Sequence, residues 1–368
     1  MKNKKFLIAF GIITLVAVVA IGVYKNHQQS SQEDLRIVLS LPLTGAGAKT
    51  GENAKFAYEL CVDDWNNQGG VLNHRVVLDI FDNKAEAKQG AMIARQVISS
   101  GSINTPFAVM EGVSSVFLSS QPLYEQAKIL HACIASSEKI FENNPKYTIR
   151  SYQSSKETCE FFLSNLKNRF GTDSFTLFYA DSEFANSHME QFVKLHNQYG
   201  ISIAAIHAYS EGSGSYRDVI AKAELGSEKA VYIAGQYQSL GRIVRQIRES
   251  GYNGLIFGDG HINSPSAVDM MGDYTHGVYA INIKKVDASR PVMEAFKSRF
   301  GREMDDIAIL AYNGMDLLFR FVEDYKSKDP EIISANINGF AMDGIAGKAK
   351  VINYEIVVDH EFTPVEDK

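Results

Sequence analysis

Hydrophobic and polar positions alternate along this chain with two different periods, and the first instance defines the pattern. A short apolar run at 37–41 ends at Pro42, whose missing N–H suits the end of a strand. Apolar residues then recur with the spacing of one helical face over 54–65, and a glycine pair at 69–70 closes the segment. Thr50 is expected to cap this helix. The stretch predicts a strand, a glycine-broken turn and an amphipathic helix.

The same strand and helix pattern repeats along most of the chain. The expected strands lie at 76–81, 107–110, 129–134, 175–180, 201–207, 230–234 and 255–258. The expected helices lie at 87–98, 114–128, 156–170, 185–199, 216–224 and 240–250. Strands that alternate with helices form parallel sheets covered by helices. The predicted fold class is therefore α/β, with doubly wound parallel sheets.

The loop between the first strand and the first helix is rich in glycine, which is also typical of nucleotide sites. Gly45, Gly47 and Gly51 are spaced one residue too far apart for the dinucleotide fingerprint. The segment 48–50 lacks the second glycine that a phosphate-binding loop has before its lysine. These glycines therefore indicate a tight turn rather than a nucleotide site.

The N-terminal segment predicts export from the cytoplasm. Lysines at positions 2, 4 and 5 precede an almost uninterrupted apolar run over 6–24. Small residues near the end of this run suit a signal peptidase, but the length of the run also suits a retained anchor. We expect residues 1–30 to be either a cleaved signal peptide or an N-terminal membrane helix. Since no cysteine follows the apolar run before Cys61, a lipid-modified cysteine is not expected.

Composition and charge narrow the function classes. Hydrophobic residues make up 45% and charged residues 22%, as in ordinary soluble domains, and the length after the export segment suits two of them. A net charge of −6, with scattered lysines and arginines, gives no basis for binding nucleic acid. The nine histidines have no metal-ligand spacing and no nucleophile motif is present, so we expect no cofactor and no enzyme activity. Cys61, Cys133 and Cys159 are interpreted as small core residues, with a disulfide left open.

Several segments of the chain, taken in order, resemble one known family. They include LPLTGAGAKTGENAKFAYELCVDDWNNQGG, HRVVLDIFDNKAEAKQGAMIARQVI, FYADSEFANS, YIAGQYQSLGRIVRQIRESGYN, IFGDGH and GIAGKAKVIN. Over residues 36–355 the chain resembles the type I periplasmic binding proteins, in particular the leucine/isoleucine/valine-binding receptors of ABC transporters. In two places it departs from them: SYQSS at 151–155 lacks the family's aspartate, and Thr50 stands where some members have a ligand-stacking tyrosine. The pocket is therefore expected to differ from that of a leucine binder.

The resemblance implies two doubly wound lobes joined by a three-strand hinge, with a ligand enclosed between them. The first lobe is expected to comprise 34–150 plus 283–340, and the second lobe 151–282 plus 341–368. The three crossings between the lobes are expected near Arg150, Asn282 and Gly339. Ligands of such sheets bind at the carboxyl ends of strands, where helix N-termini offer free N–H groups.

In the first lobe the resemblance points to two loops that follow strands. A serine at the place of Ser114 binds the α-carboxylate of the ligand in the family, and Ser115 is its neighbour; the alternative for Ser114 is a plain helix cap. Ser136 and Ser137 follow the next strand, where they would contact the ligand or form a turn. Glu111 ends a strand, where it would either bind a ligand amine or lie at the rim of the cleft, and the family does not assign it.

In the second lobe three further positions are implied. Phe184 corresponds to an aromatic residue that packs on the ligand, with a core position as the alternative. Tyr237 corresponds to an aromatic residue that covers the ligand, although a shift of one position would place Gln236 there. Asp259 lies close to the family's acidic residue that takes the ligand ammonium.

The expected function follows from the resemblance. It is a monomeric, exported receptor of the periplasm that captures an amino acid or a similar small polar ligand by hinge closure. The closed form would deliver the ligand to the membrane permease of an ABC transporter. A ligand-sensing ectodomain that docks on a membrane receptor has the same fold and the same pocket, so the sequence leaves this alternative open.

Overall fold

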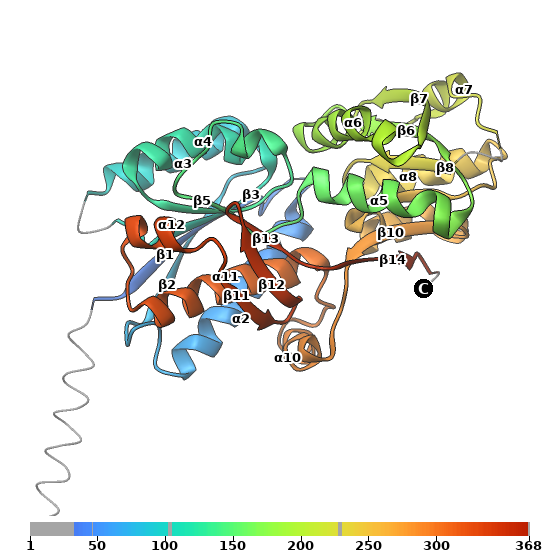
Figure 1. Cartoon of the computed structure of the whole chain (residues 1–368). Helices are drawn as coiled ribbons and strands as arrows, with labels where there is room; N and C mark the ends of the chain where they lie inside the picture. The colour runs from blue at the N-terminus through green and yellow to red at the C-terminus, as the bar shows by residue number, and fades with distance from the viewer. Residues whose placement is uncertain (1–32, 46, 102–104, 227–229, 367–368) are drawn as a thin grey trace, which may run out of the picture.

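The computed structural model describes residues 33–45, 47–101, 105–226 and 230–366. The expected signal peptide or anchor at 1–30 lies outside these residues. Within them, no helix is both long enough and apolar enough to span a bilayer. The described chain forms two α/β lobes side by side, each built around one sheet (Figure 1).

The first lobe contains an eight-stranded sheet with the order β11-β12-β13-β5-β4-β3-β1-β2. Its strands are β1 (Leu35–Leu41), β2 (Val76–Asp82), β3 (Ala108–Gly112), β4 (Leu130–Ile134), β5 (Thr148–Arg150), β11 (Ala341–Gly344), β12 (Gly347–Ile352) and β13 (Glu355–Val357). β1 to β5 pair in parallel, whereas β11, β12 and β13 pair with one another antiparallel. Both faces of β1 are buried: Ile37 and Leu39 face one core and Val38 the other, because successive side chains of a strand point to opposite faces.

Helices cover both faces of this sheet (Figure 1). They are α2 (Ala48–Asn67), α3 (Ala87–Ser99), α4 (Ser114–Ala127), α10 (Arg290–Phe300), α11 (Asp306–Tyr325) and α12 (Pro330–Asn336). α2 and α11 pack against each other and bury the larger core, which includes Tyr58 and Phe319. α3 and α4 pack against each other over a smaller core around Ile93 and Tyr124. The two helix pairs leave the carboxyl ends of the parallel strands facing the other lobe.

The second lobe contains a six-stranded sheet with the order β14-β10-β9-β8-β6-β7. Its strands are β6 (Ser174–Ala180), β7 (Ser202–Tyr209), β8 (Ala230–Ala234), β9 (Ile256–Asp259), β10 (Val278–Ile283) and β14 (His360–Pro364). Its helices are α5 (Ser155–Phe170), α6 (Glu183–Leu195), α7 (Arg217–Lys222), α8 (Tyr237–Glu249) and α9 (Pro265–Met271). Aromatic side chains hold its core together, since Phe162 meets Tyr232 edge-on with ring centroids 5.0 Å apart and Phe257 at 5.1 Å.

The three cysteines are buried and free. Cys61 belongs to α2, Cys133 to β4 and Cys159 to α5. Burial raises the pKa of the Cys133 thiol to about 12, which keeps the thiol protonated. All three are small core residues, as the sequence indicated, and the disulfide that it left open is not formed.

The chain passes between the lobes after β5, after β10 and between β13 and β14. The third crossing therefore lies at 358–359, so the prediction of a crossing near Gly339 is wrong. The strands at 341–357 belong to the first lobe, not to the second as predicted, and of the segment 341–368 only β14 joins the second sheet. Long-range pairing explains the difference, because β13 lies parallel to β5 with Glu355 beside Arg150.

Arg150 supplies the physical reason for that pairing. Its side chain is fully buried, and a buried guanidinium requires an anionic partner. Nη1 lies 2.9 Å from Oε2 of Glu355 and 3.6 Å from Oε1 of Glu138, and Nη2 donates to the carbonyl of Ser137 at 2.6 Å. The hairpin of β11 and β12 is thereby held to the first sheet through β13.

Candidate ligand-binding site

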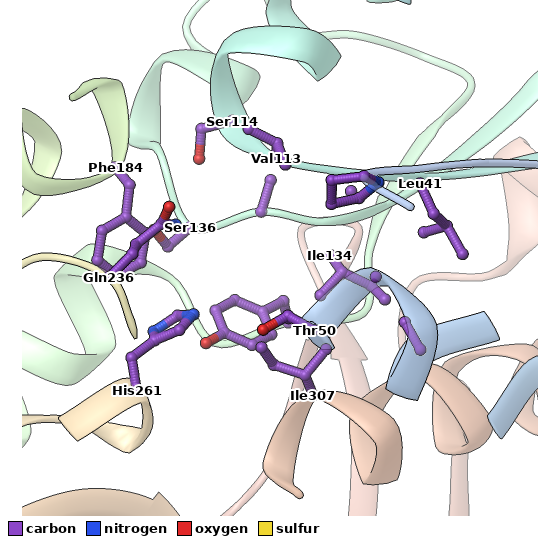
Figure 2. A pocket seen from close by; sticks show the side chains of 16 residues that line it. Leu41, Thr50, Val113, Ser114, Ile134, Ser136, Phe184, Gln236, His261 and Ile307 are labelled. Atoms are coloured by element: carbon purple, nitrogen blue, oxygen red, sulfur yellow. The ribbon is translucent and has the colours of Figure 1, made fainter. Parts of the chain in front are cut away.

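A cavity lies between the two lobes, with about 460 Å³ of unfilled space that is partly open to solvent. Figure 2 shows its walls, which both lobes contribute. They are Leu41, Pro42, Thr50, Gly51, Ala54, Gly112, Val113, Ser114, Ile134, Ala135, Ser136, Tyr152, Phe184, Gln236, His261 and Ile307. Most of these residues lie at or just beyond the carboxyl ends of β1, β3, β4, β5, β8 and β9, the edge at which open α/β sheets bind ligands, and the others belong to α2, α6 and α11.

The first lobe presents two hydroxyl groups to this cavity. Ser114 begins α4 and Ser136 follows β4, and both side chains are almost completely buried. Neither Oγ atom has a hydrogen-bond partner among the described residues. Figure 2 shows both hydroxyl groups directed into the cavity. Since buried polar groups nearly always have a hydrogen-bond partner, we expect a ligand or an ordered water molecule to supply the partner of each hydroxyl group.

The start of α4 adds backbone donors beside Ser114. No side chain caps this helix, and the first N–H groups of a helix have no partner within it. The residue before the helix, Val113, has φ of 77°, which is unusual for a β-branched residue. Such strained backbone is concentrated at functional sites, and here it turns the chain sharply from β3 into α4. The alternative of Ser114 as an N-cap is excluded, because Ser114 is the first helical residue.

In the second lobe, His261 and Phe184 form the facing wall. The ring centroids of these two residues lie 5.1 Å apart at an angle of 78°. Behind His261 lies Asp259, whose Oδ1 accepts from the His261 backbone N–H at 3.0 Å and lies 3.1 Å from Nδ1. Burial opposes a charged ring, yet the carboxylate of Asp259 raises the pKa of His261 above its ordinary value. The ring, not the carboxylate, lines the cavity.

Asp259 and Glu111, the two acids proposed from the sequence, are not among the described residues that line the cavity. Glu111 is completely buried on the side of the sheet covered by α4. Its carboxylate accepts from Ser40 Oγ at 2.6 Å and from Ser120 Oγ, and it lies 3.1 Å from Nε2 of His131. It therefore belongs to a hydrogen-bond network inside the first lobe.

The other predicted positions fall beside the cavity. Ser137 donates to Oε1 of Glu183 at 2.9 Å, a contact between the lobes. Ser115 follows Ser114 in α4 but is not among the described lining residues. Tyr237 begins α8, and its side chain lies outside the described part of the structure. Gln236, the alternative to Tyr237, lines the cavity.

Sequence reasoning anticipated one lining residue only in part and missed others. The resemblance placed Thr50 where some members have a ligand-stacking tyrosine, and Thr50 lines the cavity. It was also expected to cap α2, but the cap is Gly47 and Thr50 lies inside the helix. Tyr152 lies two residues after β5, in the segment that departs from the family pattern, and that departure was a usable signal. His261 follows β9 by two residues, and only the turn that begins at Gly260 decides that it faces the cavity.

The site has the chemistry of reversible binding. Its polar side chains carry O–H or N–H groups, and the remainder of the wall is mainly apolar, as in sites for small organic ligands. Among the described residues, no group of three or more histidine, cysteine, aspartate or glutamate side chains could hold a metal ion.

Comparison with known proteins agrees with this architecture. Residues 34–365 match the profile of a family described as "Periplasmic binding protein". A leucine-, isoleucine-, valine-, threonine- and alanine-binding protein of Pseudomonas aeruginosa is 21% identical over 332 residues, which is 87% of this chain and 86% of the relative.

Two solved structures share the fold. The substrate-binding protein of a branched-chain amino acid transporter from Streptococcus pneumoniae, in complex with isoleucine, has a TM-score of 0.80 at 17% identity, covering 91% of this chain and 97% of that chain. A solute-binding protein of an ABC transporter from Rhodopseudomonas palustris, in complex with 3,4-dihydroxybenzoic acid, has a TM-score of 0.79 at 17% identity, covering 91% and 94%. These matches confirm the predicted two-lobed fold. The family comprises solute-binding proteins rather than enzymes, and this chain belongs to the periplasmic binding protein family.

Proposed function

We propose that this protein is an extracytoplasmic receptor that captures a small polar ligand, an amino acid or a similar carboxylate, between its two lobes. The observation that carries the proposal is the pair of buried hydroxyl groups of Ser114 and Ser136, which lack partners among the described residues and face one cavity. Together with the uncapped start of α4, they form a set of donors that suits a carboxylate.

The walls of the cavity suit the rest of such a ligand. Leu41, Ile134 and Ile307 of the first lobe and Phe184 of the second lobe offer apolar surface next to the two serines. A buried carboxylate gains about 1.5–3 kcal/mol from each good hydrogen bond, while the apolar walls contribute roughly 25 cal/mol per Å² buried. Isoleucine and 3,4-dihydroxybenzoic acid, the ligands of the two structural relatives, both combine a carboxylate with a less polar body.

Contacts between the lobes support binding by hinge closure. Lys139, in the short helical turn after β4 of the first lobe, donates to Oε2 of Glu183 on α6 at 3.1 Å. The backbone N–H of Glu138 donates to Ser187 Oγ on the same helix at 3.1 Å. Closure changes the relative position of the two lobe surfaces, and a membrane permease of an ABC transporter would recognise that change. The expected place of action is the periplasm.

A thermal-shift screen tests the proposal. The panel comprises amino acids, amides, urea, small carboxylates and sugars, each added to the purified protein. A true ligand at about 100 times its dissociation constant stabilises the folded state by roughly 2.7 kcal/mol. The double variant Ser114→Ala/Ser136→Ala is the matched control and should lose most of this shift. If no compound of the panel raises the melting temperature of the wild type, the receptor function is wrong.

Delivery to a permease needs a separate assay. Uptake of the radiolabelled ligand is compared in cells that contain and cells that lack the protein, at a ligand concentration below its dissociation constant. We expect uptake to require the protein. Equal uptake in both cells, despite tight binding by the purified protein, would contradict the transport role and favour a sensing role.

A further inference from the structure

The cavity between the lobes presents hydrogen-bond donors from both sides, but its described lining residues include no aspartate or glutamate. An amino acid ligand brings an ammonium group with three N–H donors as well as its carboxylate. A closed site must supply acceptors and a counter-charge for that ammonium, because an unpaired buried charge is strongly unfavourable. The carboxylates nearest to the cavity therefore decide which ligand the site can hold.

On the side of the second lobe, the nearby carboxylates are already used by the protein. Asp259 accepts two contacts from His261, which stands between it and the cavity. Glu211 accepts from the backbone N–H of Gln236 at 2.9 Å and from Ser239 Oγ at 3.3 Å through the same Oε1. Both side chains hold a loop or turn of the second lobe in place.

On the side of the first lobe, Asp305 lies in an adjoining part of the cleft, which shares Thr50, Tyr152, His261 and Ile307 with the cavity. Its carboxylate accepts from Asn53 Nδ2 at 2.7 Å and caps α11 by accepting from the Ala308 N–H at 2.8 Å.

Asp306, the neighbour of Asp305, also accepts a hydrogen bond from within the protein. Asp306 also lines the adjoining part of the cleft, and it accepts from the Ile283 N–H at 2.9 Å. Glu111 is enclosed within the first lobe. A small ligand seated on Ser114 would therefore meet no carboxylate among the described lining residues of the cavity to balance the charge of an ammonium group.

His261 is the one ionisable side chain among the described lining residues of this cavity, apart from the phenol of Tyr152. Its imidazole lies closer to the cavity than the Asp259 carboxylate behind it, and that carboxylate favours the protonated ring by raising its pKa, so the positive end of the pair faces a ligand. A positive end attracts a carboxylate and repels an ammonium group. The arrangement therefore favours an anion without a compensating positive charge.

Building on the proposed receptor function, we propose that the ligand is a small monocarboxylic acid that lacks an α-ammonium group and has an apolar body, and that His261 with Asp259 behind it excludes the corresponding amino acid. The carboxylate is seated at Ser114, Ser136 and the start of α4. The apolar body lies against Ile134, Phe184 and Ile307.

Isothermal titration of the full protein with matched pairs tests this inference. The pairs are propanoate and alanine, 4-methylpentanoate and leucine, and 3-phenylpropanoate and phenylalanine, which differ within each pair only by the amino group. We expect at least one acid to bind about tenfold or more tightly than its amino acid partner, the scale of one missing charge-assisted contact. Equal affinities, or tighter binding of the amino acid, would overturn the inference while the receptor function stands.

Two variants sharpen the test. Ser114→Ala should weaken the acid and the amino acid by the same factor, because both carry the carboxylate. His261→Glu combined with Asp259→Asn supplies a carboxylate at the cavity and should reverse the preference within the pair, whereas an unchanged preference would refute the role of His261. Circular dichroism checks that the double variant is folded. If it is not folded, His261→Gln replaces it in the titrations, and this single variant should reduce the preference for the acid over the amino acid without reversing it.

Other outcomes separate this inference from the receptor function. If neither member of any pair binds but a sugar, amide or urea does, the carboxylic acid inference fails and the receptor function stands. If no compound binds at all, both fail. If leucine or phenylalanine binds and Asp305→Asn removes that binding, the adjoining acid holds the ammonium group and the inference is refuted.

Discussion

Two serines of α4 allow a direct test of which residues bind the ligand and which stabilise the fold. Ser114 and Ser120 are both buried serines of the same helix. The Ser114 hydroxyl faces the cavity without a partner among the described residues, whereas Ser120 donates to the Glu111 carboxylate and lies 3.0 Å from the Phe117 carbonyl. Substituting each by alanine should therefore have opposite consequences.

The magnitudes follow from what each hydroxyl contacts. Ser114→Ala removes a group that contributes nothing to the ligand-free protein, so the free energy of unfolding should change by less than about 0.5 kcal/mol. Its loss should weaken binding of a carboxylate ligand by about 1 kcal/mol, roughly fivefold, because the N–H groups of α4 remain. Ser120→Ala deprives the buried carboxylate of Glu111 of a donor, which should cost about 1–3 kcal/mol of stability.

The assay combines urea unfolding without ligand and isothermal titration with the carboxylate that the thermal-shift screen identifies. Ser114→Ala should keep the urea midpoint and lose affinity, while Ser120→Ala should lower the midpoint and keep the affinity. If Ser114→Ala lowers the urea midpoint as much as Ser120→Ala and leaves the affinity unchanged, its hydroxyl has a structural partner and the assigned position of the carboxylate is wrong.

Three further predictions concern the scaffold. Gly241→Ala should lower the melting temperature, with a loss of about 1–3 kcal/mol, because the new Cβ would lie 2.1 Å from the Ala267 carbonyl oxygen; Gly214→Ala, which meets open space, is the control in the same melting experiment. Burial lowers the pKa of His360 to about 4, so between pH 6.5 and 4 the unfolded state binds a proton that the folded state does not. The free energy of unfolding should therefore fall by up to roughly 3 kcal/mol as the pH drops through this range. Urea midpoints measured at pH 7 and 4.5 should show a smaller fall for His360→Gln than for the wild type. Arg150→Met should cost about 3–5 kcal/mol in urea unfolding by leaving Glu355 unpaired, and an equal loss in the double variant Arg150→Met/Glu355→Met would show that the ion pair is not the cause.

The local pattern of the sequence was sufficient for the elements and for part of the site. Alternating apolar runs and helical faces predicted most strands and helices, because burial on both sides of a parallel sheet leaves a near-continuous apolar run in each strand. The resemblance pointed to Ser114 and Ser136, and the rule that ligands bind at the carboxyl ends of parallel strands picks out the same two loops. Each follows a parallel strand, and the carboxyl ends of neighbouring parallel strands meet at one edge of the sheet.

The direction of the side chains at the strand ends could not be predicted from the local sequence pattern. Glu111 shares a face of β3 with Val109, since alternate residues point the same way, but only packing showed that α4 covers that face and supplies Ser120 as a donor. Asp259 and His261 are two residues apart, and a tight turn after β9 sends the carboxylate inward and the imidazole toward the cavity. At the wall of the cavity a histidine thus lies where the resemblance implied an acid.

The last part of the chain shows the same limit on a larger scale. The strands at 341–357 are short, and nothing in their own residues distinguishes one sheet from the other. Their place depends on Arg150, far earlier in the chain, whose buried guanidinium pairs with the Glu355 carboxylate. The periodic elements and the strand ends that carry donors could therefore be predicted from the amino-acid sequence, because they depend on neighbours along the chain. Which sheet takes the last strands, and which side chains line the cavity, emerged only from the folded chain, because both depend on contacts between residues that are distant in the sequence.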